Sequence, residues 1–193
     1  MPSYFDFEVS LLGIKPRIWR RFLLMEKATF ENLHEVIQAA FGWENGHLYE
    51  FREKGRRGQR LCRADYEDPY GEDDAPFAKK LKARDVLAQQ GDMCLYVYDF
   101  GDDWHHDVVL KGMVEMPEKF SCRLLDGARN GPPEDCGGIW GYDECCQAVA
   151  YTEGALAKLS KKEREDVKSR REWLGDCRPE DFDLAARRKR FDR

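Results

Sequence analysis

Three of the four histidines lie in segments that also carry aromatic and acidic residues, a combination that can bind a divalent metal ion. Zinc and similar ions accept imidazole nitrogen and carboxylate oxygen as ligands. His34, His47 and His106, with Asp99 or Asp102 as the carboxylate, would form such a site if folding brought them together. No pair shows the His-x-x-x-His spacing, however. The alternative is that each histidine is a core-edge residue hydrogen-bonded to a neighbour, because buried polar groups need partners.

A second set of candidates lies in two loops, Tyr98–His106 and Pro132–Gly138. Cys136 precedes two glycines, so its thiolate could stand beside backbone N–H groups that hold an oxyanion, with His106 as the base. The alternative is that the glycines form a tight turn and Cys136 is a small buried side chain. The predicted pocket consists of Asp99, Asp102, Trp104, His106, Glu134, Asp135 and Cys136.

Two arginine-rich segments could bind nucleic acid. Arg17, Arg20 and Arg21 surround Trp19, a pattern that can hold phosphate or stack on bases, and Arg187 and Arg188 begin a basic run near the C-terminus. Arginines on a strand more often lie on a solvated face and pair with acidic neighbours. The chain supplies such neighbours, because residues 61–147 carry 9 basic and 19 acidic groups.

These residues must be positioned by an α+β fold. Alternation predicts strands at residues 4–11, 17–24, 47–51, 93–99 and 104–114, with the last two joined by an Asp/Gly hairpin turn. Side-chain period places His106 on the same face as Trp104 and His105 on the opposite face. Helical spacing, a Thr29 cap and a Gly42 stop predict a helix over residues 30–41. Further helices are expected at 81–89, 142–151, 158–174 and 179–191, and loops at 52–74 and 117–138.

The expected architecture is a mixed, largely antiparallel sheet with helices packed on one face. At 193 residues and 42% hydrophobic content, the chain can build one substantial core, so residues 1–193 are interpreted as a single domain with a helical C-terminal extension from about 142. The acidic run at residues 65–74 lacks the spacing of an EF-hand and is interpreted as a solvated loop.

Composition also bounds the compartment. No window approaches the length of apolar sequence that spans a bilayer, and the N-terminus lacks the layout of a secretory signal, so a cytoplasmic protein without membrane contact is expected. Seven cysteines without any Cys-x-x-Cys pair are expected to be thiols.

Separated motifs in one order resemble the plasmid pRiA4b ORF-3-like family across nearly the whole chain. They are Gly13–Arg21, Leu33–Gln38 with Phe41–Trp43, His47–Phe51, Tyr96–His106, Gly131–Gly138 and Asp181–Asp183. Some members of that family carry a resolvase-like label and are passengers of mobile elements, but the nucleophilic serine among arginines and the helix-turn-helix of a serine resolvase are missing here. The family commonly shows Arg-Ala-Cys where this chain has Arg129-Asn-Gly131, which leaves Cys122 and Cys136 of three family cysteines.

The leading hypothesis for function is a noncatalytic binding or interaction module associated with mobile elements, with a protein or small-molecule ligand. No phosphate-cradling glycine loop, catalytic triad spacing or dinucleotide fingerprint is present, and polar side chains gather in loops, where binding sites tend to occur. One alternative is a metal-dependent hydrolase that uses the His/Asp cluster with a divalent ion such as zinc. The other is a DNA-associated accessory protein that uses the arginines.

Overall fold

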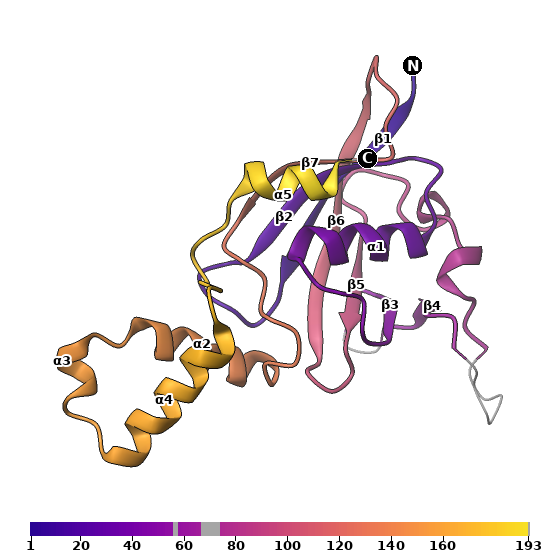
Figure 1. The fold of residues 1–193 in the computed structure, drawn as a ribbon. Helices are drawn as coiled ribbons and strands as arrows, with labels where there is room; N and C mark the ends of the chain where they lie inside the picture. Colours follow the sequence, from indigo (N-terminus) through magenta and orange to yellow (C-terminus); the bar gives the residue numbers. More distant parts are fainter. Residues whose placement is uncertain (56–57, 67–73, 193) are drawn as a thin grey trace.

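The computed structural model describes residues 1–55, 58–66 and 74–192, and within these ranges seven strands form one sheet (Figure 1). The strand order is β4-β3-β5-β6-β1-β2-β7, and every pair of neighbouring strands is antiparallel. The expected α+β fold with a largely antiparallel sheet is confirmed, and the one parallel pairing in this part of the chain is an isolated bridge between Arg63 and Phe77. The strands are β1 (Ser3–Leu11), β2 (Trp19–Met25), β3 (Tyr49–Glu53), β4 (Arg60–Arg63), β5 (Met93–Tyr98), β6 (Trp104–Glu115) and β7 (Cys122–Ala128).

Strand β1 is an interior strand of the sheet, because it pairs with β2 on one side and with β6, the middle strand, on the other. Its alternating residues Phe5, Phe7, Val9 and Leu11 are buried on the helix-covered side, as the period-two pattern predicts. Strand β6 repeats the arrangement, with Trp104, His106 and Val108 buried in a row and His105 partly exposed. The expected facing of the two adjacent histidines is confirmed.

Helix α1 (Phe30–Phe41) crosses the sheet and covers its core (Figure 1). The Thr29 side chain accepts a hydrogen bond from Asn32 N–H and the Asn32 side chain accepts one from Thr29 N–H, a reciprocal cap. Gly42 ends the helix in the left-handed conformation with φ of 90°. Both ends of this helix agree with the prediction.

Two strands lie in segments that the sequence pattern assigned to loops. Strand β4 falls in the expected loop at 52–74, of which residues 56–57 and 67–73 lie outside the described residues, and β7 falls in the expected irregular segment. Strand β7 is an edge strand paired with β2, and only alternate side chains, Cys122 and Leu124, are buried. A strand this short, with polar residues among the apolar ones, shows no clear alternation of hydrophobic residues in the sequence.

The helix expected at residues 81–89 is replaced by two single 3₁₀ turns, η1 (Ala78–Lys80) and η2 (Ala83–Asp85). Here the backbone bonds to its surroundings: Phe30 N–H donates to Leu81 C=O, and Ala83 N–H donates to Ala28 C=O. Lys82 also bridges to Thr29 as an isolated antiparallel pair. The contact with Phe30 N–H uses the Leu81 carbonyl, which a helix over 81–89 would have bonded internally.

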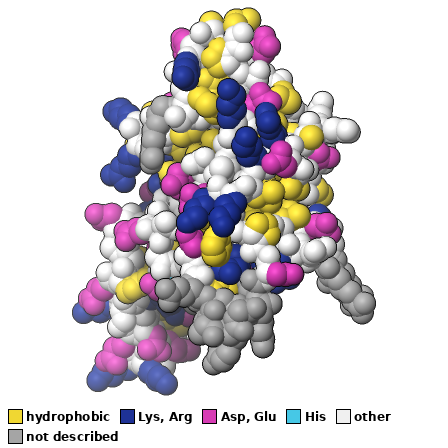
Figure 2. All heavy atoms as spheres, turned by 90° about the vertical axis from the view of Figure 1, so that its right-hand side faces the viewer, with side chains coloured by type: hydrophobic (Ala, Val, Ile, Leu, Met, Phe, Trp, Pro, Cys, Tyr) yellow, Lys and Arg dark blue, Asp and Glu magenta, His cyan; other side chains and the backbone are white. Residues whose placement is uncertain are grey.

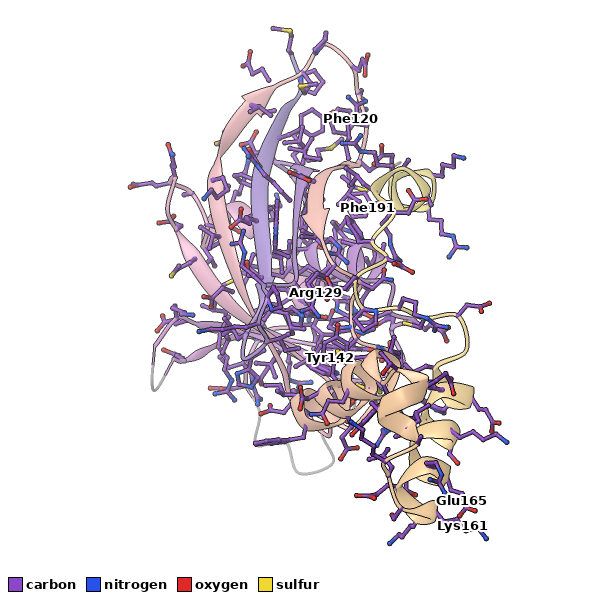
Figure 3. All side chains as sticks on the ribbon, turned by 90° about the vertical axis from the view of Figure 1, so that its left-hand side faces the viewer. Phe120, Arg129, Tyr142, Lys161, Glu165 and Phe191 are labelled. Carbon is purple, nitrogen blue, oxygen red and sulfur yellow. The ribbon has the colours of Figure 1, made fainter. Side chains whose placement is uncertain are left out.

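The C-terminal third forms an arm and a return helix. Helices α2 (Gly138–Ala150), α3 (Glu153–Leu156) and α4 (Lys161–Leu174) project from one end of the sheet, and α5 (Leu184–Phe191) returns to lie beside β7 (Figure 1). Phe191 is fully buried against the sheet, as Figure 3 shows from the side. The arm begins four residues earlier than expected because Gly137 and Gly138, both at positive φ, lead directly into the helix. None of the described helices has the length and apolar composition needed to cross a bilayer.

Candidate cation site

Three loops bring their side chains together at one end of the sheet. His47 comes from the loop between α1 and β3, Asp99 from the turn between β5 and β6, and Asp135 from the loop between β7 and α2. The His47 Nε2 atom lies 3.1 Å from Asp135 Oδ1 and 3.6 Å from Asp99 Oδ2. One ligand atom of each residue lies within 4.8 Å of the other two, the one such group of three found among the described residues. The sequence predicted His47 and Asp99 as metal ligands, but placed Asp135 in the pocket only.

Local backbone geometry holds the Asp99 carboxylate in place. Asp99 N–H donates to Leu48 C=O at 2.9 Å, which ties the turn to the segment that carries His47. Gly101 N–H donates to Asp99 Oδ1 at 2.9 Å, so one carboxylate oxygen is fixed and the other, Oδ2, points toward His47. Left-handed backbone at non-glycine residues recurs around this site, in Asn45, Asp99, Asp103 and Asp135, with φ of 55–58°.

The Glu134 carboxylate lies beside this group and is positioned by two donors. Tyr98 Oη–H and Glu44 N–H each donate to Glu134 Oε1 at 2.9 Å. The second oxygen, Oε2, is buried without a hydrogen-bond partner among the described residues and lies 3.9 Å from His47 Nε2. Burial and the neighbouring Glu134 carboxylate raise the pKa of Tyr98, so its hydroxyl stays protonated and donates. Tyr98 was not among the predicted site residues.

The loop that carries Glu134 and Asp135 is attached to the rest of the site at both ends. Trp43 Nε1–H donates to Pro132 C=O at 2.8 Å, and Gly137 N–H donates to Asp102 Oδ2 at 3.1 Å. A Cβ at Gly138 would lie 2.7 Å from the Asp102 carbonyl oxygen, so the two loops approach too closely there for any side chain. Asp102 therefore joins the loops rather than the group around His47.

His34 belongs to a separate buried network. Its Nε2 lies 2.6 Å from Asn45 Oδ1 and its Nδ1 lies 2.8 Å from Tyr96 Oη. Because the amide oxygen can only accept, Nε2 carries the proton and Nδ1 accepts from the tyrosine hydroxyl. The ring also stacks on Tyr49 with centroids 3.5 Å apart. Burial lowers the His34 pKa to about 4, and the alternative reading of this histidine, a core residue bonded to its neighbours, describes it well.

His106 is fully buried between aromatic rings and is also outside the group around His47. Its ring contacts Phe41, Trp43 and Tyr96 at centroid distances of 5.0–5.3 Å. Backbone groups of neighbouring strands lie near the ring, yet neither nitrogen makes a hydrogen bond of normal geometry to a described residue. Burial lowers the pKa of His106 to about 3. A neutral, enclosed imidazole of this kind has no route to a thiol or a substrate at the site.

Cys136 has the properties of a structural residue. Its side chain is buried, and burial raises the pKa of its thiol to about 12, so the thiol is protonated at neutral pH. The thiol faces Gly138 C=O at 3.8 Å rather than a base. The geometry thus matches the small buried side chain that was the alternative to a nucleophile.

The predicted nucleic-acid arginines contact other parts of the protein, although only Arg20 among them is buried. Arg20 is fully buried: its guanidinium donates to four backbone carbonyls at 2.7–3.0 Å and stacks on Phe182 at 3.8 Å. Arg21 forms a bidentate pair with Asp6. Arg17 pairs with Glu8. Arg188 donates hydrogen bonds to the carbonyls of Leu124 and Leu125. Arg187 lies against Gly42.

The face of the molecule shown in Figure 2 carries basic and acidic side chains side by side with apolar ones between them. A nonspecific nucleic-acid surface would show basic side chains gathered on one face. On this face the charges are interspersed.

Comparison with known proteins identifies relatives that align with most of this chain. The model of the plasmid pRiA4b ORF-3-like protein family matches residues 3–186. The uncharacterized protein y4hQ of Sinorhizobium fredii is 37% identical over 149 residues, which are 77% of this chain and 74% of that protein. The crystal structure of MM3350, a protein of unknown function from Methanosarcina mazei Go1, has a TM-score of 0.77 at 32% identity and covers 96% of this chain and 98% of its own. These names state neither a ligand nor a reaction, so function must be argued from the site.

Proposed function

The chain belongs to the plasmid pRiA4b ORF-3-like family, and we propose that it is a binding module that holds a divalent cation such as zinc at His47, Asp99 and Asp135. The observation that carries the proposal is that one nitrogen and two carboxylate oxygens from three different loops lie within 4.8 Å of one another. An association with mobile elements, suggested by the plasmid in the family name, is part of the proposal.

The spacing of the ligand atoms fits an ion. Zinc binds imidazole nitrogen and carboxylate oxygen at about 2.0–2.2 Å, so two ligands of a tetrahedral ion lie about 3.3–3.6 Å apart. The distances from His47 Nε2 to the two carboxylates, 3.1 Å and 3.6 Å, are close to that spacing, and the two carboxylates, which lie within 4.8 Å of each other, would close on the ion. A cation would also balance the negative charge that Glu134 adds beside the two aspartates.

The site can present its ion to a ligand. The Asp135 side chain is 73% exposed and that of His47 is 31% exposed, whereas Asp99 is buried below them. The ion would therefore be bound by Asp99 on its protein side and would keep a coordination position open to solvent. A small molecule or a protein side chain with a free oxygen or nitrogen could then occupy the open position.

Glu134 supports metal-dependent hydrolysis as a second candidate. Its Oε1 is fixed by two donors, and its Oε2 is 3.9 Å from the proposed ligand atom of His47. A carboxylate so placed could accept a proton from a water molecule bound to the ion, which is the general-base role in metal-assisted hydrolysis. The same carboxylate could instead serve as a fourth ligand.

Titration calorimetry with zinc on metal-free protein tests the binding module. We expect one equivalent to bind to the wild type, and His47→Gln and Asp135→Asn to weaken binding at least tenfold. His105→Gln is the matched control, because His105 also pairs with a neighbouring aspartate but lies outside the group. Binding that all three variants leave unchanged, or no binding by the wild type, would overturn the proposal.

The hydrolase candidate is separated from the binding module by Glu134→Gln. If Glu134 is a general base, the variant keeps zinc affinity within about threefold and loses most of any zinc-dependent hydrolysis of a p-nitrophenyl phosphate or ester, since an effect of this kind is worth about a hundredfold or more. Zinc-loaded wild type without activity on either substrate class would leave the noncatalytic module as the better account.

A further inference from the structure

The helical arm contains a groove that the cation site does not explain. It lies between α2 and α4, has a volume of about 810 Å³, and reaches the loop of Asp135 at the base of the arm. Such a volume falls in the range of ligand-binding clefts. Its lining comes from Asp135, from Glu144, Gln147 and Ala148 of α2 with Tyr151 directly after it, and from Leu159, Glu163, Asp166, Val167, Ser169, Arg170 and Trp173 around α4.

Helical spacing shows that the groove is a face of each helix rather than a gap at their ends. Residues 144, 147 and 148 of α2, with residue 151 directly after it, recur at intervals of three and four, and so do residues 163, 166, 167, 170 and 173 of α4. The two stripes face each other across the groove. Arg171 holds the helices at this distance, because its guanidinium donates to the carbonyls of Ala148 and Tyr151.

The groove is acidic. Its lining contains four carboxylates and one cationic side chain. The cationic side chain is Arg170, which pairs with Glu144. The net charge of the lining is therefore −3, counted as one positive against four negative groups. Glu163 caps α4 through Ser160, whereas Asp166 is exposed and faces the groove from the middle of the helix. Such a lining attracts a partner with several positive charges.

The apolar part of the groove is also suited to a cationic partner. Trp173 is 51% exposed, Tyr151 is half-buried, and Leu159 and Val167 lie between them. Tryptophan and tyrosine faces bind guanidinium and ammonium groups by cation–π contact. Tryptophan and tyrosine are also enriched among the residues that carry most of the binding energy of protein interfaces.

We propose that the groove between α2 and α4 docks a basic polypeptide segment, in which arginine or lysine side chains meet the carboxylates and apolar side chains pack on Trp173, Val167 and Leu159. The groove shares Asp135 with the cation site, but its other carboxylates, Glu144, Glu163 and Asp166, lie on α2 and α4 and outside that site. The two proposals can fail separately, because zinc binding is tested with variants of His47 and peptide binding with variants of α4.

Fluorescence anisotropy with two labelled peptides of equal length tests the groove on the full-length protein. In one peptide arginine alternates with leucine, and in the other glutamate replaces arginine. We expect the arginine peptide to bind in low salt, to weaken steeply as salt is added, and the glutamate peptide not to bind. Asp166→Lys should weaken binding at least tenfold, and Trp173→Ala at least fivefold.

Glu165→Lys is the matched control, because it makes the same charge change on the same helix away from the groove. Glu165 lies at the far end of the arm beside Lys161, as Figure 3 shows, with a side chain that is 66% exposed. Its variant should bind within about twofold of the wild type. Equal weakening by Asp166→Lys and Glu165→Lys would show that net charge alone attracts the peptide and would overturn the proposal, as would binding of the glutamate peptide. Circular dichroism of each variant confirms that the arm remains helical.

Discussion

Lowering the pH from 7 to 5 should destabilise the protein through two buried histidines. In the unfolded chain both have a pKa of 6.5, whereas burial lowers the pKa of His106 to about 3 and that of His34 to about 4 in the folded state. Below pH 6.5 the unfolded chain therefore binds protons that the folded protein does not. Stability is fully present above pH 6.5, is lost as the pH falls below it, and the loss levels off near the folded pKa values.

The magnitude follows from the same pKa values. At pH 5 an unfolded imidazole is largely protonated and the buried one is neutral, which costs about 2 kcal/mol per histidine relative to pH 7. The free energy of unfolding of the wild type should fall by about 4 kcal/mol through His34 and His106 together, in addition to any effect of carboxylates. The His106→Leu variant lacks one of the two groups, so its free energy of unfolding should fall by about 2 kcal/mol less than that of the wild type between pH 7 and pH 5.

Urea unfolding followed by circular dichroism at pH 7, 6 and 5 measures these free energies. The control is His105→Leu, because His105 neighbours His106 in the chain but is partly exposed on the opposite face of β6. Its curve should run parallel to that of the wild type. If the free energy of unfolding of His106→Leu falls with pH as much as that of the wild type, His106 is not a buried neutral imidazole and the reasoning fails.

Three further predictions concern residues that hold the fold and the site together. Arg20→Lys should lower the unfolding free energy by about 3 kcal/mol, because one ammonium cannot replace the guanidinium bonds to four carbonyls; urea denaturation checks this, and Arg17→Lys, at an exposed pair with Glu8, should cost less than about 1 kcal/mol. Gly138→Ala should lower the melting temperature and weaken zinc binding, because a Cβ would lie 2.7 Å from Asp102 C=O at a φ of 67°; Gly154→Ala, where a Cβ meets nothing within 4 Å, should affect neither. Tyr98→Phe should leave Glu134 with one donor instead of two and, if Glu134 is the fourth ligand, weaken zinc binding by about threefold to tenfold in calorimetry; an unchanged affinity would show that Glu134 is not a ligand of the ion.

Features that depend on short-range periodicity could be predicted from the order of the residues. The alternation in β1 and β6, the facing of His105 and His106, and both ends of α1 followed from side-chain period and capping chemistry, because these depend on residues within one or two turns of each other. The motifs that indicated the family are local in the same sense. Expectations based on weak patterns were less successful: β7 is an edge strand with two buried side chains, and residues 81–89 bond to the turn before α1 instead of forming a helix.

Which polar residues contact one another depends on how the whole chain folds. His34, His47 and His106 were equivalent candidates in the sequence, yet only His47 reaches Asp99 and Asp135, while the other two are enclosed among aromatic rings. Arg20 has the sequence surroundings of an exposed arginine but donates to four buried carbonyls. Contacts between residues about 50 to 90 positions apart, such as His47 with Asp99 and Asp135, are set by how the loops at one end of the sheet converge. That convergence results from strand order and loop packing, for which no single stretch of residues carries a signal.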